Sequence, residues 1–205
     1  MIKALLLIFR PAQTWGAIES SKRGIAYLLC VYLLPLILIT SIAEGYGLMH
    51  WGKLHKGEVT QVRNYNLTQV IVMEVAQSVG LIGMVFLGAF AAKSFAETFH
   101  RRSKFSEAFT AVAYAAGPLL MMRFGDLFPT LNVWVPWAVG IILMVSVLYL
   151  GLPCMLRPDP PHAFGLYVMT SITIVMVNAV MRLFVYFFHQ GGFPKIEHWL
   201  NGMGS

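Results

Sequence analysis

The sequence predicts an all-α integral membrane protein, with five transmembrane helices in a bundle and an interfacial helix before the first of them. Hydrophobic residues make up 58% of the 205 residues and charged residues 12%, whereas a soluble domain is about 45–50% apolar. The mean hydropathy is +0.68. Apolar segments long enough to cross about 30 Å of hydrocarbon recur along the chain. We therefore expect a lipid bilayer around the protein and no large aqueous domain between the spans.

Residues 1–23 form the predicted interfacial segment. Residues 1–9 are apolar, Pro11 interrupts them, and residues 12–23 mix Trp15 with acidic and basic side chains. An apolar face flanked by cations is typical of a helix that lies in the membrane surface. No small-residue cleavage pattern follows the first apolar run. We therefore do not interpret it as a secretory signal peptide, and we expect the first span to act as an uncleaved insertion signal.

Five apolar segments meet the length criterion for a transmembrane helix. Because the number is odd, the two termini are expected on opposite sides of the membrane. The spans form one predicted transmembrane domain, 24–190, and a short exterior tail, 191–205, follows it. The longest connection runs from Glu44 to Asn66, between the first two spans. The five segments are residues 24–43, 67–95, 105–127, 133–153 and 164–189.

Lysine and arginine residues near the span ends predict the orientation, because cytoplasmic loops carry more of them. Nine lie on the side of the N-terminus and six on the other side. We therefore expect a cytoplasmic N-terminus and an exterior C-terminus. The nine are Lys3, Arg10, Lys22, Arg23, Lys93, Arg101, Arg102, Lys104 and Arg157, and the six are Lys53, Lys56, Arg63, Arg123, Arg182 and Lys195.

The formal net charge of +6 does not indicate a nucleic-acid partner, because the basic residues cluster at the ends of apolar runs and not along one face. One cluster, between the second and third spans, is a candidate for binding anionic lipid headgroups. Each basic residue near an anionic surface contributes roughly 1 kcal/mol. The alternative is that these residues only set the topology. They are Lys93, Arg101, Arg102 and Lys104.

Two ionisable residues lie well inside predicted spans, Glu74 in the second and Arg182 in the fifth. At 1.5 Å per residue, both lie roughly 10 Å below the outer boundary of the membrane. A lone charge there costs about 2.5–3.5 kcal/mol on insertion scales, and pairing reduces that cost. We therefore predict a Glu74–Arg182 ion pair, with Gln77 and Asn178 one helical turn away in an intramembrane polar cluster. The cluster either fixes two helices in register or forms a polar path for an ion or a headgroup.

Small residues recur at spacings of three and four in the second and third spans, which places them on single helix faces. Close approach of backbones stabilises helix association in lipid, so these faces predict packing within the bundle or self-association with a second copy. The two cysteines, Cys30 and Cys154, lie in apolar stretches. We interpret them as small buried hydrophobic residues, not as a disulfide or a metal pair.

Patterns typical of enzymes and metal sites do not occur in the sequence, so we predict no catalytic residue, no metal and no cofactor. There is no phosphate-binding glycine loop, nucleophile elbow or His-Glu-x-x-His run. Glu97 and His100 have the Glu-x-x-His spacing of di-iron bundles, but such sites need that motif twice. His50 and His55 are too few for a zinc site.

Three short motifs follow one another along the chain. They are Pro11-x-x-x-Trp15 before the first span, AFTAVAYAAGP at 108–118 in the third, and Tyr149-Leu150-Gly151-Leu152 at the end of the fourth. In this order they resemble the Yip1 domain family. The resemblance implies an all-helical five-span protein with a cytoplasmic N-terminus.

Eukaryotic Yip1 proteins act with Rab-type GTPases in vesicle traffic at Golgi and endoplasmic reticulum membranes. They carry a long polar N-terminal segment, whereas residues 1–23 alone precede the first span here. The chain is in this respect similar to compact bacterial members of the family. That similarity implies a bacterial plasma (inner) membrane and leaves the GTPase partner without a binding segment.

These observations leave three hypotheses for the function. The first is a non-enzymatic membrane protein that organises membrane lipid or partner proteins. The second is an accessory subunit of a larger membrane complex, suggested by the small size and short loops. The third is a small solute or lipid transporter that uses the polar cluster and would need a continuous polar cavity. The expected partners are the lipid bilayer and a membrane protein or a second copy of the chain.

Overall fold

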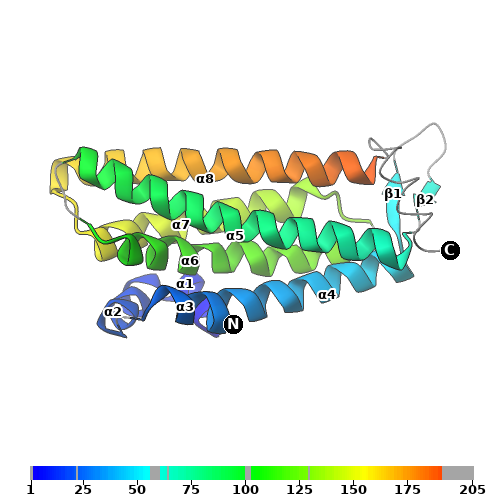
Figure 1. The fold of residues 1–205 in the computed structure, drawn as a ribbon, viewed down its shortest axis with the longest axis horizontal. Helices are drawn as coiled ribbons and strands as arrows, with labels where there is room; N and C mark the ends of the chain where they lie inside the picture. Colours follow the sequence, from blue (N-terminus) through cyan, green and yellow to red (C-terminus); the bar gives the residue numbers. More distant parts are fainter. Residues whose placement is uncertain are drawn as a thin grey trace.

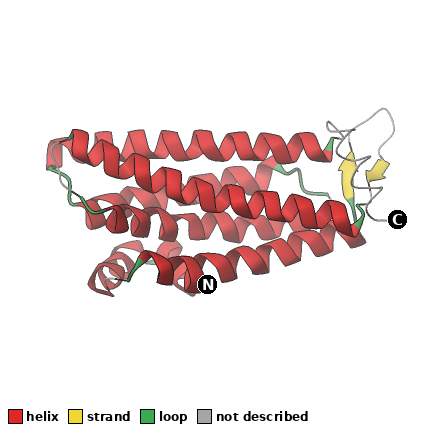
Figure 2. Cartoon of the chain, in the orientation of Figure 1, coloured by secondary structure: helices red, strands yellow, loops and turns green. Residues whose placement is uncertain are grey.

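The computed structural model is an all-α bundle, as the sequence predicts, and it describes residues 2–21, 23–55, 61–63, 65–99, 103–128 and 130–190. Within these residues, five helical segments are long and apolar enough to cross a membrane. Figure 2 shows the long helices running along the long axis of the molecule. The five segments are Ile25–His50, Leu67–Thr98, Phe105–Leu127, Trp134–Leu156 and Pro160–His189.

The first and third spans are interrupted helices. The first consists of α3 (Ile25–Tyr27), a π-helical turn η1 (Leu28–Leu33) and α4 (Leu34–His50). The third consists of α6 (Phe105–Met122) and a 3-10 turn η2 (Arg123–Leu127). The other spans are the single helices α5 (Leu67–Thr98), α7 (Trp134–Leu156) and α8 (Pro160–His189). Between α4 and α5, the short strands β1 (Lys53–His55) and β2 (Gln61–Arg63) pair antiparallel, with Leu54 opposite Val62.

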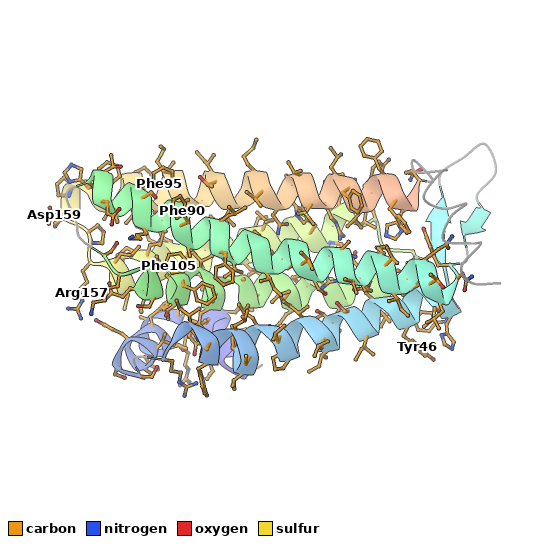
Figure 3. The ribbon with its side chains drawn as sticks, in the orientation of Figure 1. Tyr46, Phe90, Phe95, Phe105, Arg157 and Asp159 are labelled. Atoms are coloured by element: carbon orange, nitrogen blue, oxygen red, sulfur yellow. The ribbon has the colours of Figure 1, made fainter. Side chains whose placement is uncertain are left out.

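Successive spans run in opposite directions, so the bundle has two distinct ends (Figure 1). At the hairpin end, on the right of Figure 1, α4 and α6 finish near β1 and β2. At the α2 end, on the left, α5 and α7 finish and α8 begins. In Figure 3, Tyr46 marks the hairpin end, and Arg157 and Asp159 mark the α2 end.

The first span is longer than the sequence predicted. It continues to His50, whereas the predicted span ended at residue 43 and the predicted loop began at Glu44. The helix continues through Gly45 and Gly47 because α4 packs closely against its neighbours at these positions. A Cβ atom on Gly47 would lie 2.5 Å from the carbonyl oxygen of Leu127. Tertiary packing therefore overrides the poor helix propensity of glycine, and Glu44 lies inside the bundle and not in a loop.

The centre of the bundle is α6, in which every residue from Ala108 to Leu120 is buried. It packs most extensively against α7 and next against α5. Many of its side chains are alanine or glycine, which lets the neighbouring backbones approach. On α5, a Cβ atom on Gly88 would lie 2.7 Å from Ile174 of α8. The small-residue faces therefore pack within the chain, which is one of the two predicted alternatives.

The outer faces of the other four spans carry large exposed apolar side chains, such as Ile42 on α4, Val79 on α5, Ile142 on α7 and Val180 on α8. In water, an apolar surface on every side of a monomer would be unfavourable. Acyl chains suit it, because lipid is as apolar as these side chains. The surface therefore fits a multi-pass membrane protein.

A proline inside α6 frees one carbonyl oxygen in the centre of the bundle. Pro118 has no N–H group, so the Tyr114 carbonyl lacks its usual helical donor. The Tyr32 hydroxyl of η1 donates to this carbonyl at 3.4 Å, and the two tyrosine ring centroids lie 4.6 Å apart. Backbone groups in a membrane interior need an internal partner. This hydrogen bond therefore ties the first span to α6 beside the proline.

The segment before the first span folds into two helices, α1 (Ile2–Phe9) and α2 (Pro11–Ser21), which meet at the predicted break. Leu7 and Trp15 are buried where these helices pack against α6 and α7. The location of α2 in the membrane interface stays a prediction. Cys154 is half-buried, but Cys30 is exposed, so the prediction that both cysteines are buried is wrong. Cys30 lies on the outer surface of the first span, where a small apolar group suits lipid.

Candidate functional site

Five ionisable side chains meet inside the spans near the hairpin end, and together they are termed the five-charge cluster. All five are between 1% and 8% exposed. Charged residues are rare within transmembrane segments and mark sites with a specific role. They are Glu44 on α4, Glu74 on α5, Arg123 and Asp126 on η2, and Arg182 on α8.

The turn η2 supplies two of the five charges. Residues three apart lie above one another in a 3-10 helix, so Arg123 and Asp126 share one face of the turn, and both are buried. Close contacts at two glycines fix this turn. Gly47 admits the η2 backbone against α4, and a Cβ atom on Gly125 would lie 2.7 Å from the Pro136 ring of α7. The turn is therefore held between α4 and α7.

Arg123 binds both glutamates of the cluster. Its Nη2 donates to Glu44 Oε2 at 2.8 Å and to Glu74 Oε2 at 3.0 Å, and its Nε donates to Glu44 Oε2 at 3.2 Å. Gln77 joins the same groups. Its Nε2 donates to Glu44 Oε1 at 3.3 Å, and its Oε1 accepts from Arg123 at 3.4 Å. One guanidinium group therefore connects α4, α5 and η2.

Arg182 binds the other acidic residue of the cluster. Its Nη2 donates to the two carboxylate oxygens of Asp126 at 2.7 and 3.0 Å, and its Nε donates to the Val133 carbonyl at 3.1 Å. The predicted Glu74–Arg182 ion pair is therefore wrong. The physical reason is η2, which places an opposite charge next to each of these two residues.

A cavity of about 50 Å³ adjoins the five-charge cluster. Its polar lining comes from Gln77, Arg123, Asp126, Asn178 and Arg182. Asn178 also accepts a hydrogen bond at 2.6 Å from Trp137 Nε1. One water needs about 10–15 Å³ of such volume, so the cavity has room for a few water molecules. Three of the four residues predicted for a polar cluster line this cavity, and Glu74 binds Arg123 beside it.

A second cavity, of about 480 Å³, opens at the α2 end and is termed the basic cleft. Residues of α2, α6 and α7 line it, together with residues that flank these helices. Apolar side chains of α2 and α7 form part of the wall, and the remaining lining residues are polar. These are Arg23, Lys104 and Arg157, Glu19 and Glu107, and the hydroxyl residues Ser106 and Thr110.

Arg157 holds α2 against the end of α7. It terminates α7 in the left-handed conformation, with φ 46° and ψ 54°, which costs an L-residue about 1–2 kcal/mol. Its guanidinium group forms an ion pair with Glu19 of α2. The hydrogen bond from Arg157 lowers the pKa of Glu19. The strained residue therefore serves to join the two helices.

Two of the four predicted headgroup-binding residues lie in the described part of the chain. Lys104 precedes α6 and lines the basic cleft. Lys93 lies on α5, 3.5 Å from Glu97, and does not line the cleft. Arg101 and Arg102 lie outside the described residues.

The described residues hold no group of three or more His, Cys, Asp or Glu side chains that could bind a metal. The His50 ring stacks on Tyr46 with centroids 4.0 Å apart. His100 and the side chain of His55 lie outside the described residues.

The three sequence motifs meet at one contact in the bundle. Trp15 packs edge-on against Tyr114, with ring centroids 6.3 Å apart. A Cβ atom on Gly151 would lie 2.4 Å from the Trp15 ring, so glycine leaves the room that the indole needs. The motif residues of α2, α6 and α7 therefore form a single packing unit.

The family model described as the Yip1 domain matches residues 5–182. The chain belongs to the Yip1 family. Yip1 proteins are generally non-enzymatic. The Yip1 match includes the Trp15–Gly151 contact and all members of the five-charge cluster. No curated protein and no solved structure matches the chain.

Sequence reasoning missed three members of the five-charge cluster in this Yip1 domain, namely Glu44, Arg123 and Asp126. The sequence pattern predicts a loop at Glu44, and it indicates for Arg123 only a role in setting the orientation. A usable signal was present, because Arg123 and Asp126 both fall within the predicted third span, 105–127. A charge at that depth needs a partner, as Glu74 and Arg182 do.

Proposed function

We propose that this Yip1-family chain is a non-enzymatic membrane protein that organises anionic lipid at the basic cleft. The supporting observation is the composition of the cleft, in which three cations and two hydroxyl residues lie beside apolar side chains. A phospholipid has the matching form, with a charged headgroup on an apolar body. The size of the cleft, about 480 Å³, lies in the range of about 300–1,000 Å³ that is usual for ligand pockets.

The charges of the cleft favour an anionic headgroup. Three basic and two acidic residues line it, which gives a formal sum of +1. The acidic groups are already engaged, because Glu19 pairs with Arg157 and Glu107 Oε2 accepts from the Lys104 backbone N–H at 3.1 Å. Arg23 donates to the Tyr27 hydroxyl, and not to a carboxylate, at 2.8 Å. The start of α6 adds the positive end of a helix dipole.

Lipid enrichment around the purified protein tests this proposal. The chain is reconstituted in vesicles of equal phosphatidylglycerol and phosphatidylcholine, extracted with its nearest lipids into nanodiscs, and the retained lipids are counted. Arg23→Gln is expected to lower the preference for phosphatidylglycerol about fivefold, since a direct ion pair with a headgroup at a partly exposed site contributes up to about 1 kcal/mol. Arg10→Gln is the matched control, because Arg10 is exposed and does not line the cleft. Equal effects of the two variants, or no preference in the wild type, would refute the proposal.

The proposal places the α2 end at the cytoplasmic face of a bacterial plasma membrane. It rests on the excess of basic residues on that side, nine against six. Cysteine labelling tests it at two exposed positions, Ser20 on α2 and His50 at the end of α4, after Cys30→Ala and Cys154→Ala. An impermeant maleimide is expected to label His50→Cys in intact cells and Ser20→Cys only after lysis. The reverse pattern would invert the orientation.

Binding to a protein partner and self-association are two further proposals, and a separate capture experiment tests both. Capture of the tagged chain in mild detergent, followed by mass measurement, distinguishes one foreign subunit at fixed stoichiometry from a multiple of the chain itself. The structure gives no support to solute transport, because the cavity beside the five-charge cluster measures only about 50 Å³.

A further inference from the structure

The five-charge cluster contains more carboxyl groups than guanidinium groups. Asp126 and Arg182 face each other, so within the described part of the chain Arg123 is the one cation that forms ion pairs with Glu44 and Glu74. With every group ionised, these five residues would hold one excess negative charge inside the bundle. An uncompensated buried charge is costly, and a buried carboxyl group commonly becomes neutral instead.

The hydrogen bonds distinguish the two glutamates. Glu44 accepts with both oxygens, from Arg123 at Oε2 and from Gln77 at Oε1. Glu74 accepts from Arg123 at Oε2, but its Oε1 is buried and has no hydrogen-bond partner among the described residues. The residue as a whole is 8% exposed. An ionised carboxylate only accepts hydrogen bonds, whereas a protonated one carries an O–H group that can donate, and the Ser41 hydroxyl of α4 faces Glu74 as an acceptor for it. Glu74 is therefore the better carrier of a proton.

The groups that face Glu74 come from each neighbouring element. Glu44 and Ser41 face it from α4, and Arg123 and Asp126 lie on η2. Arg182 and His189 of α8 act at longer range on Glu44, the other glutamate of the pair. The two arginines already bind carboxylates, and the Nδ1 atom of His189 is hydrogen-bonded to the Tyr65 hydroxyl at 2.8 Å. The positive charge nearest to Glu74 is thus that of Arg123, which Glu74 shares with Glu44.

We propose that Glu74 is a proton-binding residue. A proton from water adds to Oε1 and makes a neutral carboxyl group, while Oε2 stays hydrogen-bonded to Arg123. Arg123 and Glu44 then form one balanced ion pair, and the cluster holds two positive and two negative charges. Release of the proton to water places two carboxylates on one guanidinium group, which weakens the connection of α5 to α4 and η2.

A small cavity with polar lining residues adjoins the cluster on one side. The cavity of about 50 Å³ is lined by Gln77 and Arg123, which both contact the glutamates. It has room for a few water molecules, at about 10–15 Å³ each. The proton site therefore lies one side chain away from a polar, hydratable space.

Infrared difference spectroscopy of the full chain in nanodiscs tests the proposal, because a protonated carboxyl group has its own carbonyl stretching band. We expect this band in the wild type at neutral pH and its loss at alkaline pH. Two variants that each remove one methylene group assign it. Glu74→Asp should shift the band, and Glu44→Asp should leave its frequency unchanged. A wild type without the band, or a shift caused by Glu44→Asp alone, would overturn the proposal.

Unfolding measured against pH gives a second readout. If the native chain holds a proton that the unfolded chain releases, the ratio of folded to unfolded protein falls about tenfold per pH unit. In the wild type this fall should continue from neutral pH to the pH at which the band disappears and should then level off. Glu74→Gln should remain folded at neutral pH and remove this fall. A Glu74→Gln curve with the slope of the wild type would contradict the proposal.

Discussion

Replacing Arg123 by methionine is expected to lower the free energy of unfolding by about 3–5 kcal/mol, the usual cost of removing one partner from a buried ion pair. Arg123 is 6% exposed and donates four hydrogen bonds to the side chains of Glu44, Glu74 and Gln77. Methionine occupies a similar space, so the loss reflects the uncompensated carboxylate and not a cavity. The folding equilibrium constant should fall by about two to three and a half powers of ten.

Reversible unfolding by dodecyl sulfate in mixed micelles, followed by tryptophan fluorescence, measures this change. Arg123→Lys keeps the positive charge but loses the planar guanidinium group and its several donors. Its loss of stability should therefore lie between zero and that of Arg123→Met. The triple variant Arg123→Met, Glu44→Gln, Glu74→Gln removes the charges together and should recover most of the lost stability. An Arg123→Met variant as stable as the wild type, or a triple variant as unstable as the single one, would refute the electrostatic account.

Three further predictions concern other parts of the bundle. Gly88→Ala should cost about 1–3 kcal/mol by overpacking, since its Cβ would lie 2.7 Å from Ile174. The matched Gly83→Ala should be neutral or stabilising, because nothing lies within 4 Å of a Cβ there, and the same micelle assay compares them. Tyr32→Phe should cost about 1 kcal/mol, since it removes the hydroxyl group that donates to the Tyr114 carbonyl of α6, and an unchanged unfolding midpoint would show that this bond contributes nothing. The pKa of Glu19 is lowered from 4.5 in the folded chain by its arginine partner, so the ion pair stabilises α2 above that pH and is lost as the pH falls through the lower folded value. Protease cleavage of α2 should therefore rise on acidification in the wild type, and a wild type that matches Glu19→Gln at every pH would contradict this.

The five spans could be predicted from the sequence because hydropathy is a local property. Each predicted segment overlaps one observed span. The largest difference in a span boundary is at the end of the first span, where α4 packs against η2. Glycine at position 47 is needed for that contact, but in a single sequence it also suits a loop. Because the predicted span stops before Glu44, the sequence does not indicate that Glu44 lies inside the bundle.

The pairing inside the five-charge cluster could not be predicted in the same way. Depth along the span placed Glu74 and Arg182 at one level, but depth does not define the rotation of each helix or what lies between them. The partner of each residue comes from η2, whose 3-10 geometry aligns Arg123 with Asp126. The basic cleft was partly predictable, since Lys104 was identified, whereas Arg157 reaches it only through a left-handed backbone.

The enclosure of α6 has a consequence for how the protein is made. This helix is synthesised third, before α7, which covers it most extensively, and Pro118 removes the helical donor of one of its carbonyl groups. Released alone into lipid, it would expose that group to hydrocarbon. The translocon should therefore retain α6 until α7 emerges and then release the two as a hairpin beside the earlier spans. Ribosome-bound nascent chains that end before Trp134 should crosslink to the translocon channel, and longer ones should crosslink to lipid.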